Sequence, residues 1–125
     1  MALDMVRRPW DYDVIVMENM FGDILPDLAG GLVGGMGMAA CGEIGDHNGL
    51  FQPAHGSAPV FAGTDAANPL AALLSASLML DYLADKTGTD HLLDAAGLIK
   101  KAIEERFAAA VVRQWNLAVT WAPSQ

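Results

Sequence analysis

The sequence predicts an α/β protein in which a mainly parallel sheet lies between two layers of helices. Residues 13–17 (DVIVM) form a short β-branched run of the kind found in buried parallel strands. A helical pattern follows this run directly, and two longer helical patterns occupy much of residues 69–112. Hydrophobic residues make up 53% of the 125 and charged residues 18%, so the chain can bury the core of one domain.

The composition excludes several classes of partner. Seven Lys and Arg residues against 15 Asp and Glu give a net charge of −8, which repels nucleic acids and anionic membrane surfaces. Cys41 is the only cysteine, so no disulfide can form within the chain, as is usual in the cytoplasm. The longest apolar stretch, residues 70–80, falls short of the ~20 residues of a membrane span. We therefore expect a cytoplasmic protein with no nucleic acid and no membrane among its partners. The acidity does not exclude a small anionic ligand, because a bound cation can invert the local field.

Prolines set the first element boundaries. Residues 2–8 are expected to end a helix at Pro9, because the residue before a proline avoids the helical region. The strand at 13–17 should lead through a turn into a helix over residues 22–32. Pro26 would be tolerated only in the first turn of that helix, where no backbone donor is needed.

Glycine and asparagine mark the middle of the chain. Residues 30–49 are glycine-rich, which predicts turns and short strands, and residues 50–51 suggest another short strand. Residues 53–68 are expected to form a long irregular loop, which in a compact domain usually has a function. Asn68 and Pro69 then supply the N-cap and first position of an apolar helix that should be buried on most sides.

An amphipathic helix is predicted over residues 90–112, and the last residues (WNLAVTWAPSQ) show no clear pattern. The apolar face of this helix is formed by Leu92, Leu93, Ala96, Ile99, Ile103 and Phe107.

Asp23 and Asp27 form the first candidate site. They are four residues apart on a predicted helix, so both carboxylates lie on one helix face, directly after a predicted strand. Carboxylate oxygens are the ligands that Mg²⁺ and Mn²⁺ prefer, but two of them make an incomplete site. The alternative is structural: one Asp caps the helix and both favour its positive N-terminal end.

The second candidate site is the loop at residues 55–59 (HGSAP). Gly56 lets the backbone approach a ligand closely, Ser57 and neighbouring amides can hold phosphate oxygens, and the His55 ring can stack on a base. The alternative is an ordinary turn with a solvated or packed histidine. A hydrolase triad has no support, because no serine lies in a nucleophile-elbow pattern.

Taken together, two long motifs resemble the β-decarboxylating dehydrogenases of the isocitrate/isopropylmalate/tartrate type. Residues 19–27 (NMFGDILPD) resemble the metal and substrate signature of that family, and residues 34–38 (GGMGM) continue the match. Residues 55–59, then 62–63 (AG) and 67–69 (ANP), resemble its adenosine-binding loop. The resemblance covers roughly residues 1–110.

The resemblance implies an isopropylmalate dehydrogenase-like fold and a cofactor-dependent oxidation. A 2-hydroxy acid would pass hydride to NAD and lose CO₂, with Mg²⁺ or Mn²⁺ polarising the ketone. Asp23 and Asp27 would be metal ligands. The implied cofactor contacts are His55, Gly56, Ser57, Ala58, Val60, Phe61 and Asn68, with His55 against the adenine and Asn68 hydrogen-bonded to it. Isopropylmalate-like or tartrate-like substrates come first, then isocitrate.

The chain departs from the family pattern at several positions. Pro26 replaces a small polar residue, and Gln52 replaces a glutamate that would place charge near the cofactor. Val60 and Phe61 stand where family members carry an Asp for the ribose of NAD, or Lys and Tyr for the 2′-phosphate of NADP. NAD is favoured over NADP because no cation is present there. The tail after about residue 110 also departs from the usual ending.

The resemblance assigns the whole chain, residues 1–125, to the C-terminal portion of the family's large cofactor- and metal-binding domain. No catalytic residue is expected here, because the Tyr and Lys acid/base pair, the substrate-binding arginines and a further metal-binding Asp belong to upstream segments of the family. Asp4 does not match that Asp. The full-length form is expected to be a homodimer. Two alternatives stay open: a non-catalytic or truncated nucleotide-binding partner subunit, and an acidic α/β domain with neither site.

Overall fold

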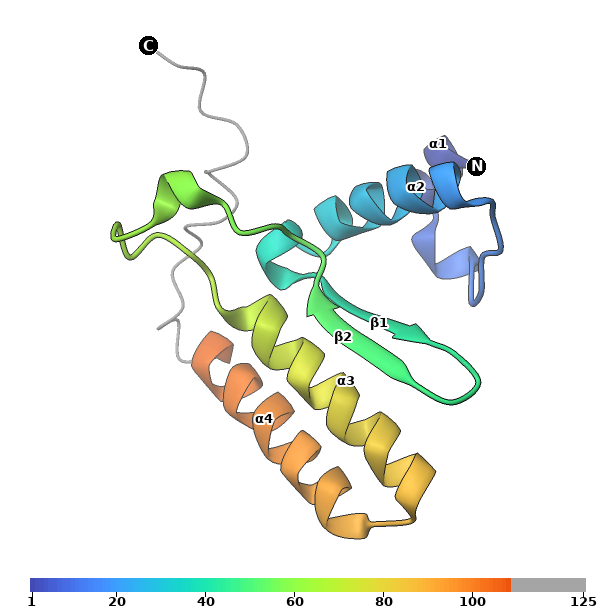
Figure 1. The fold of residues 1–125 in the computed structure, drawn as a ribbon. Coiled ribbons are helices and arrows are strands. Elements are labelled where there is room, and N and C mark those ends of the chain that lie inside the picture. The colour runs from blue at the N-terminus through green and yellow to red at the C-terminus, as the bar shows by residue number, and fades with distance from the viewer. Residues whose placement is uncertain (109–125) are drawn as a thin grey trace.

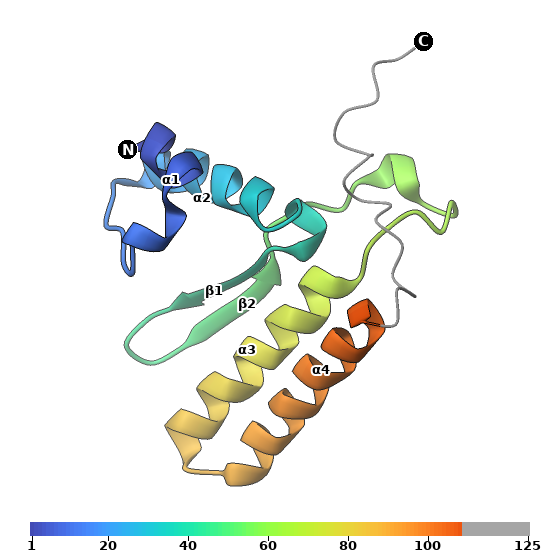
Figure 2. The same ribbon diagram turned by 180° about the vertical axis from the view of Figure 1, so that it is seen from behind.

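The computed structural model describes residues 1–108 of the chain, and one long helix organises them (Figure 1). This helix, α3 (Leu70–Thr87), lies between the helix α4 (Asp90–Ala108) and a hairpin of two strands, β1 (Ala40–Ile44) and β2 (Gly49–Pro53). The reverse view shows the same neighbours (Figure 2). The N-terminal elements extend away from this unit, so α3, α4 and the hairpin form its packed part.

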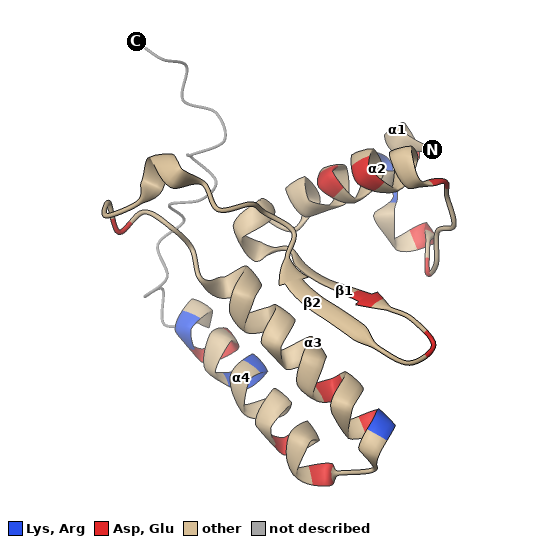
Figure 3. Ribbon diagram, in the orientation of Figure 1, with Lys and Arg blue, Asp and Glu red and all other residues tan. Residues whose placement is uncertain are grey.

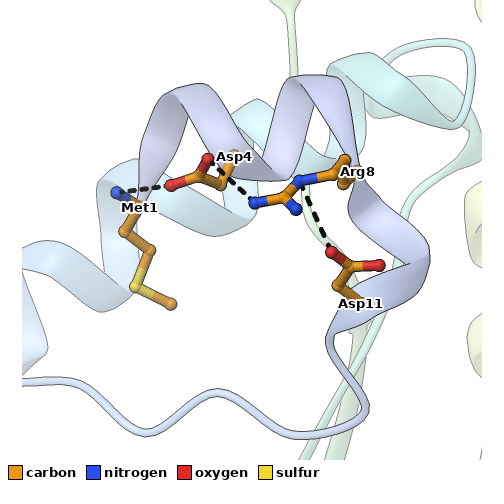
Figure 4. A network of polar contacts seen from close by, with 4 residues as sticks. All are labelled: Met1, Asp4, Arg8 and Asp11. Atoms are coloured by element: carbon orange, nitrogen blue, oxygen red, sulfur yellow. Dashed lines mark ion pairs between the residues drawn. The ribbon is translucent and has the colours of Figure 1, made fainter.

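The N-terminal helix ends where proline predicts. Helix α1 spans Ala2–Arg7, and the 3₁₀ helix η1 (Pro9–Asp11) follows it. Arg8 joins the two, with Nη2 3.6 Å from Asp4 Oδ1 and Nε 3.4 Å from Asp11 Oδ2 (Figure 4). Because these ion pairs are exposed, they contribute little to the stability of the protein, but they connect α1 to η1.

The predicted strand at residues 13–17 is not formed. The segment is extended but has no strand pairing, and the side chains of Val14 and Val16 are 82% and 91% exposed. A strand needs a hydrogen-bonded neighbour, and no described segment pairs with this one. The sheet within residues 1–108 is therefore an antiparallel hairpin rather than the expected parallel sheet.

Helix α2 (Asn19–Leu32) ends where predicted but begins earlier, at Asn19 instead of residue 22. Pro26 consequently lies inside the helix, and the expectation that it belongs to the first turn is wrong. Pro26 cannot donate the bond that the Gly22 carbonyl would accept. Pro26 is exposed, so water can satisfy that carbonyl.

The glycine-rich segment forms the predicted turns and a strand. Gly34 and Gly35 have φ of 110° and 109°, which side chains rarely tolerate, and they reverse the chain after α2. The 3₁₀ helix η2 (Met36–Met38) leads into β1. In the hairpin Cys41 lies opposite Gln52, and the strand predicted at residues 50–51 is the middle of β2.

Helix α4 begins where the sequence predicts, whereas α3 begins at Leu70 with Pro69 as its N-cap residue, one residue later than predicted. Asn68 Oδ1 still accepts a hydrogen bond from the Leu70 N–H at 3.0 Å, so the Asn68 side chain satisfies the first backbone donor of α3. Gly88 ends α3 in the left-handed conformation (φ 66°), and α4 starts at Asp90. Residues 109–112 of the predicted second helix and the tail lie outside the described residues.

Small side chains let α3 approach both of its neighbours. Ser77 and Ala96 are 0% and 1% exposed where α3 meets α4, and Ser77 Oγ donates to the Ala96 carbonyl at 3.3 Å. On the hairpin side, Ser75 Oγ donates to the Gln52 carbonyl at 2.7 Å. Leu73 remains 43% exposed, so α3 is less completely buried than predicted. None of the helices in residues 1–108 combines the length and apolar character needed to cross a bilayer.

Candidate functional site

The two aspartates of the first motif lie on neighbouring turns of α2 (Figure 3). Asp23 and Asp27 are both exposed. Within residues 1–108 neither carboxylate accepts a side-chain hydrogen bond or pairs with a Lys or Arg side chain. This face of α2 therefore carries two neighbouring carboxylates that are free to bind a ligand from solution.

The structure does not support the helix-cap interpretation of these aspartates. Helix α2 begins at Asn19, its first turn holds no acidic residue, and its N-cap is Glu18. Asp23 and Asp27 therefore lie beyond the first turn, where the helix dipole favours an anion only weakly. Their placement on one face is not explained by the needs of the helix itself.

The donor chemistry fits a hard divalent cation, and the described residues complete only part of such a site. Asp23 and Asp27 offer carboxylate oxygens on one side, which is what Mg²⁺ or Mn²⁺ takes from a protein. No group of three or more metal-binding side chains occurs in the described part of the chain. Asp4 is already paired with Arg8, the C-cap residue of α1, four positions later in the chain. Further ligands would have to come from water, substrate or other protein segments.

The loop between β2 and α3 presents backbone donors to solvent. His55, Gly56, Ser57 and Ala58 are all exposed, and within residues 1–108 their backbone N–H groups have no acceptor. The His55 Nδ1–H donates to the Gly56 carbonyl at 2.8 Å, which fixes the ring beside the loop. Free amides in a loop are the groups that hold phosphate oxygens in nucleotide sites.

The second half of this loop is a short turn of helix. Ala58 adopts a left-handed conformation (φ 42°) and precedes the 3₁₀ helix η3 (Pro59–Phe61). Val60 is 79% exposed, whereas Phe61 is half-buried. An apolar side chain therefore occupies this exposed position of the loop.

Asn68 is the predicted cofactor residue with the most contacts. Its Oδ1 caps α3, and its Nδ2 donates to Met38 Sδ at 3.5 Å. The ideal Cβ position of Gly37 lies 3.1 Å from Asn68 Cβ, so a side chain at Gly37 would press on it. The sequence marks residues 34–38 as a motif, but the contact of Met38 with Asn68 spans 30 residues and is visible only in three dimensions.

The two predicted sites lie apart in the chain. The loop with η3 and the N-terminal half of α2 lie on opposite sides of the molecule, and η2 lies between them (Figures 1 and 2). Asn68 contacts η2, and Met36 Sδ of η2 lies 3.3 Å from the ideal Cβ position of Gly30 in α2. The aspartates and the His55 loop are thus linked through η2 and do not contact each other.

The fold is that of an isocitrate dehydrogenase in part. The crystal structure of isocitrate dehydrogenase from Methylococcus capsulatus aligns with a TM-score of 0.73 and 41% identity, over 83% of this chain and 29% of that one. The α/β class and the partial character of the predicted fold are thereby confirmed.

The chain belongs to the isocitrate/isopropylmalate dehydrogenase family, whose model matches residues 1–118. It is 52% identical over 103 residues to the isocitrate/homoisocitrate dehydrogenase of Thermus thermophilus, covering 82% of this chain and 29% of that protein. It is 44% identical over 119 residues to the probable mitochondrial NAD isocitrate dehydrogenase subunit alpha of Caenorhabditis elegans, covering 95% and 31%. The chain therefore spans under a third of the length of these relatives.

Proposed function

We propose that residues 1–125 form the metal- and adenosine-binding portion of an oxidoreductase that oxidises and decarboxylates a malate-type 2-hydroxy acid with NAD. Membership of a dehydrogenase family supports the oxidative decarboxylation. Isopropylmalate-like, tartrate-like and isocitrate-like acids share the hydroxyl and carboxylates that such a reaction needs.

The observation that carries the proposal is the exposed pair Asp23 and Asp27, one turn apart and without an internal partner in the described residues. These carboxylates would hold Mg²⁺ or Mn²⁺ beside the substrate. The ion, when bound, supplies a Lewis acid for the hydroxyl and ketone oxygens of the substrate. The two aspartates orient it, and their negative charge keeps it at this face of α2.

The loop residues suit the adenosine half of the cofactor. The exposed amides of Gly56, Ser57 and Ala58 would receive phosphate oxygens, and the His55 ring would face the base. NAD is preferred to NADP because residues 55–61 contain no Lys or Arg to balance a 2′-phosphate. The name of the Caenorhabditis elegans relative supports NAD.

The protons and the substrate arginines would be supplied by segments outside residues 1–125. We propose that the full active site is shared between two subunits of a homodimer. In this proposal residues 1–125 contribute binding and orientation, and we expect the isolated chain to be inactive.

Metal and nucleotide titrations test this proposal directly. The full chain is titrated with Mn²⁺ and, separately, with NAD by calorimetry, and the Mn²⁺ titration is repeated in saturating NAD. Binding of both is expected, without oxidation of isopropylmalate or isocitrate. A chain that binds neither ligand contradicts the proposal, and turnover by the chain alone contradicts the missing acid/base pair.

A second candidate is a nucleotide-binding partner subunit without activity. Gln52 favours it: its Nε2 donates to Glu43 Oε1 at 3.0 Å, so this position serves the hairpin instead of placing charge near the cofactor. Binding of NAD together with no measurable affinity for Mn²⁺ would support this alternative.

A further inference from the structure

The side-chain amide of Asn68 is held from two sides. The Leu70 N–H can only donate, so the Asn68 atom that faces it at 3.0 Å is the carbonyl oxygen Oδ1. The nitrogen Nδ2 then points to Met38 Sδ at 3.5 Å. Because one end of the amide is fixed by the helix cap and the other by the thioether, the amide cannot flip.

This arrangement leaves one donor available. An amide nitrogen carries two hydrogens, and Met38 takes one of them. Nδ2 has no second acceptor within residues 1–108, and the residue is only half-buried. Asn68 therefore offers a single N–H of known direction at the start of α3, next to the loop with the free amides.

The 3₁₀ helix η2 supports this arrangement from the side of α2. The ideal Cβ of Gly37 lies 3.1 Å from Asn68 Cβ and 3.3 Å from Nδ2, so a side chain at 37 would require the Asn68 side chain to shift by a few tenths of an ångström. The φ of Gly37 does not lie in the left-handed region, so backbone strain does not require glycine at this position. The close approach of the Asn68 side chain does favour glycine here. Met36, one residue earlier, packs on Gly30 of α2.

We propose that Met38 and Gly37 are positioning residues that orient the Asn68 N–H toward a ring-nitrogen acceptor of the cofactor's base. The inference rests on the proposed function, because it assigns a role within the same nucleotide site. It also makes η2 the physical link between the helix with the aspartates and the loop that receives the base.

The test separates orientation from packing by exchanging the side chain of Met38. In Met38→Leu the volume is nearly kept but the sulfur acceptor is lost. In Met38→Gln a carbonyl acceptor returns on a side chain of similar length. We expect Met38→Leu to weaken NAD binding to the full chain about three- to tenfold, the effect of one lost hydrogen bond, and Met38→Gln to restore it. A packing role predicts the opposite order, because Gln would be the damaging substitution.

Gly37→Ala provides a second variant, with Gly31→Ala as its matched control. Nothing lies within 4 Å of the ideal Cβ of Gly31, whereas that of Gly37 meets Asn68. Gly37→Ala should weaken NAD binding severalfold, and Gly31→Ala should leave it unchanged. Equal NAD affinity in the wild type, Met38→Leu and Gly37→Ala would overturn the inference while the proposed function stands.

The ¹⁵N spectrum of the Asn68 side-chain amide gives a readout without nucleotide. The hydrogen on Nδ2 that faces Met38 should be displaced from its free-amide shift in the wild type and in Met38→Gln, and it should return toward that shift in Met38→Leu. A wild-type chain that leaves NAD unbound contradicts the proposed function. Even in that case the amide spectrum tests whether Met38 orients the Asn68 side chain. An unchanged spectrum in Met38→Leu would show that Met38 does not orient it.

Discussion

At the scale of single residues, the aspartate pair makes the clearest prediction. Asp23→Asn and Asp27→Asn should each weaken Mn²⁺ binding by about tenfold or more, ~1.4 kcal/mol, because each removes one charged oxygen ligand. Neither should lower the unfolding midpoint, since within residues 1–108 neither carboxylate has a structural partner. Calorimetric Mn²⁺ titration and thermal unfolding measure the two quantities.

Glu104→Gln on α4 is the matched control for these variants. It removes one negative charge from an exposed helix position outside the proposed site. If Glu104→Gln weakens Mn²⁺ binding as much as Asp23→Asn does, the ion is held by the net charge of the chain and α2 carries no specific site.

Gln52 shows how one departure from the family pattern fits its surroundings. Its Nε2 donates to Glu43 Oε1, and the register places the two side chains diagonally on one face of the hairpin. Gln52→Glu would replace this bond by two like charges. We expect a loss of about 0.5–1.5 kcal/mol in the free energy of unfolding, measured by urea denaturation.

The double variant Gln52→Glu with Glu43→Gln restores an amide and a carboxylate in exchanged positions. It should regain most of the lost stability, because only their order changes. If it is as unstable as Gln52→Glu alone, the Gln52–Glu43 contact does not stabilise the hairpin.

At the scale of elements, helix α4 is held to α3 by small residues. Ser77 and Ala96 are 0% and 1% exposed, so a larger side chain at either position must push the helices apart. Ala96→Leu is expected to lower the free energy of unfolding by about 1–3 kcal/mol, whereas Ala102→Leu, at an exposed position of the same helix, should leave it nearly unchanged. Chemical denaturation followed by circular dichroism compares the two, and equal stability would show that the α3–α4 contact is not tightly packed.

Elements whose signals are local could be predicted from the sequence. Asn68 and Asp90 mark the starts of α3 and α4, and Pro9 marks the end of α1, because caps and prolines act on adjacent backbone groups. Pro26 misled the assignment of α2, because an exposed helix position can tolerate a missing donor.

Elements that depend on distant partners could not be predicted. The run at 13–17 has strand composition, yet a strand exists only where a neighbour accepts its hydrogen bonds. The contact of Met38 with Asn68 likewise depends on how η2 packs against the start of α3. The candidate site residues themselves came from motifs, and their roles as ligands remain predictions.

At the scale of the whole molecule, the exposed run at 13–17 should govern association. Val14 and Val16 are 82% and 91% exposed, on an extended segment whose backbone pairs with no strand within residues 1–108. Unpaired extended backbone with apolar side chains recruits further strands from other molecules. We expect the chain to self-associate at micromolar concentration, and the double variant Val14→Lys, Val16→Lys to shift it toward monomer, because charges on such an edge oppose pairing. Sedimentation velocity measures the shift.

Leu98→Lys, at a 68% exposed position of α4, adds charge without touching this segment and should change the association much less. A wild-type chain that sediments as a single monomer would contradict the prediction, as would an equal effect of both variants, which would make overall charge the cause.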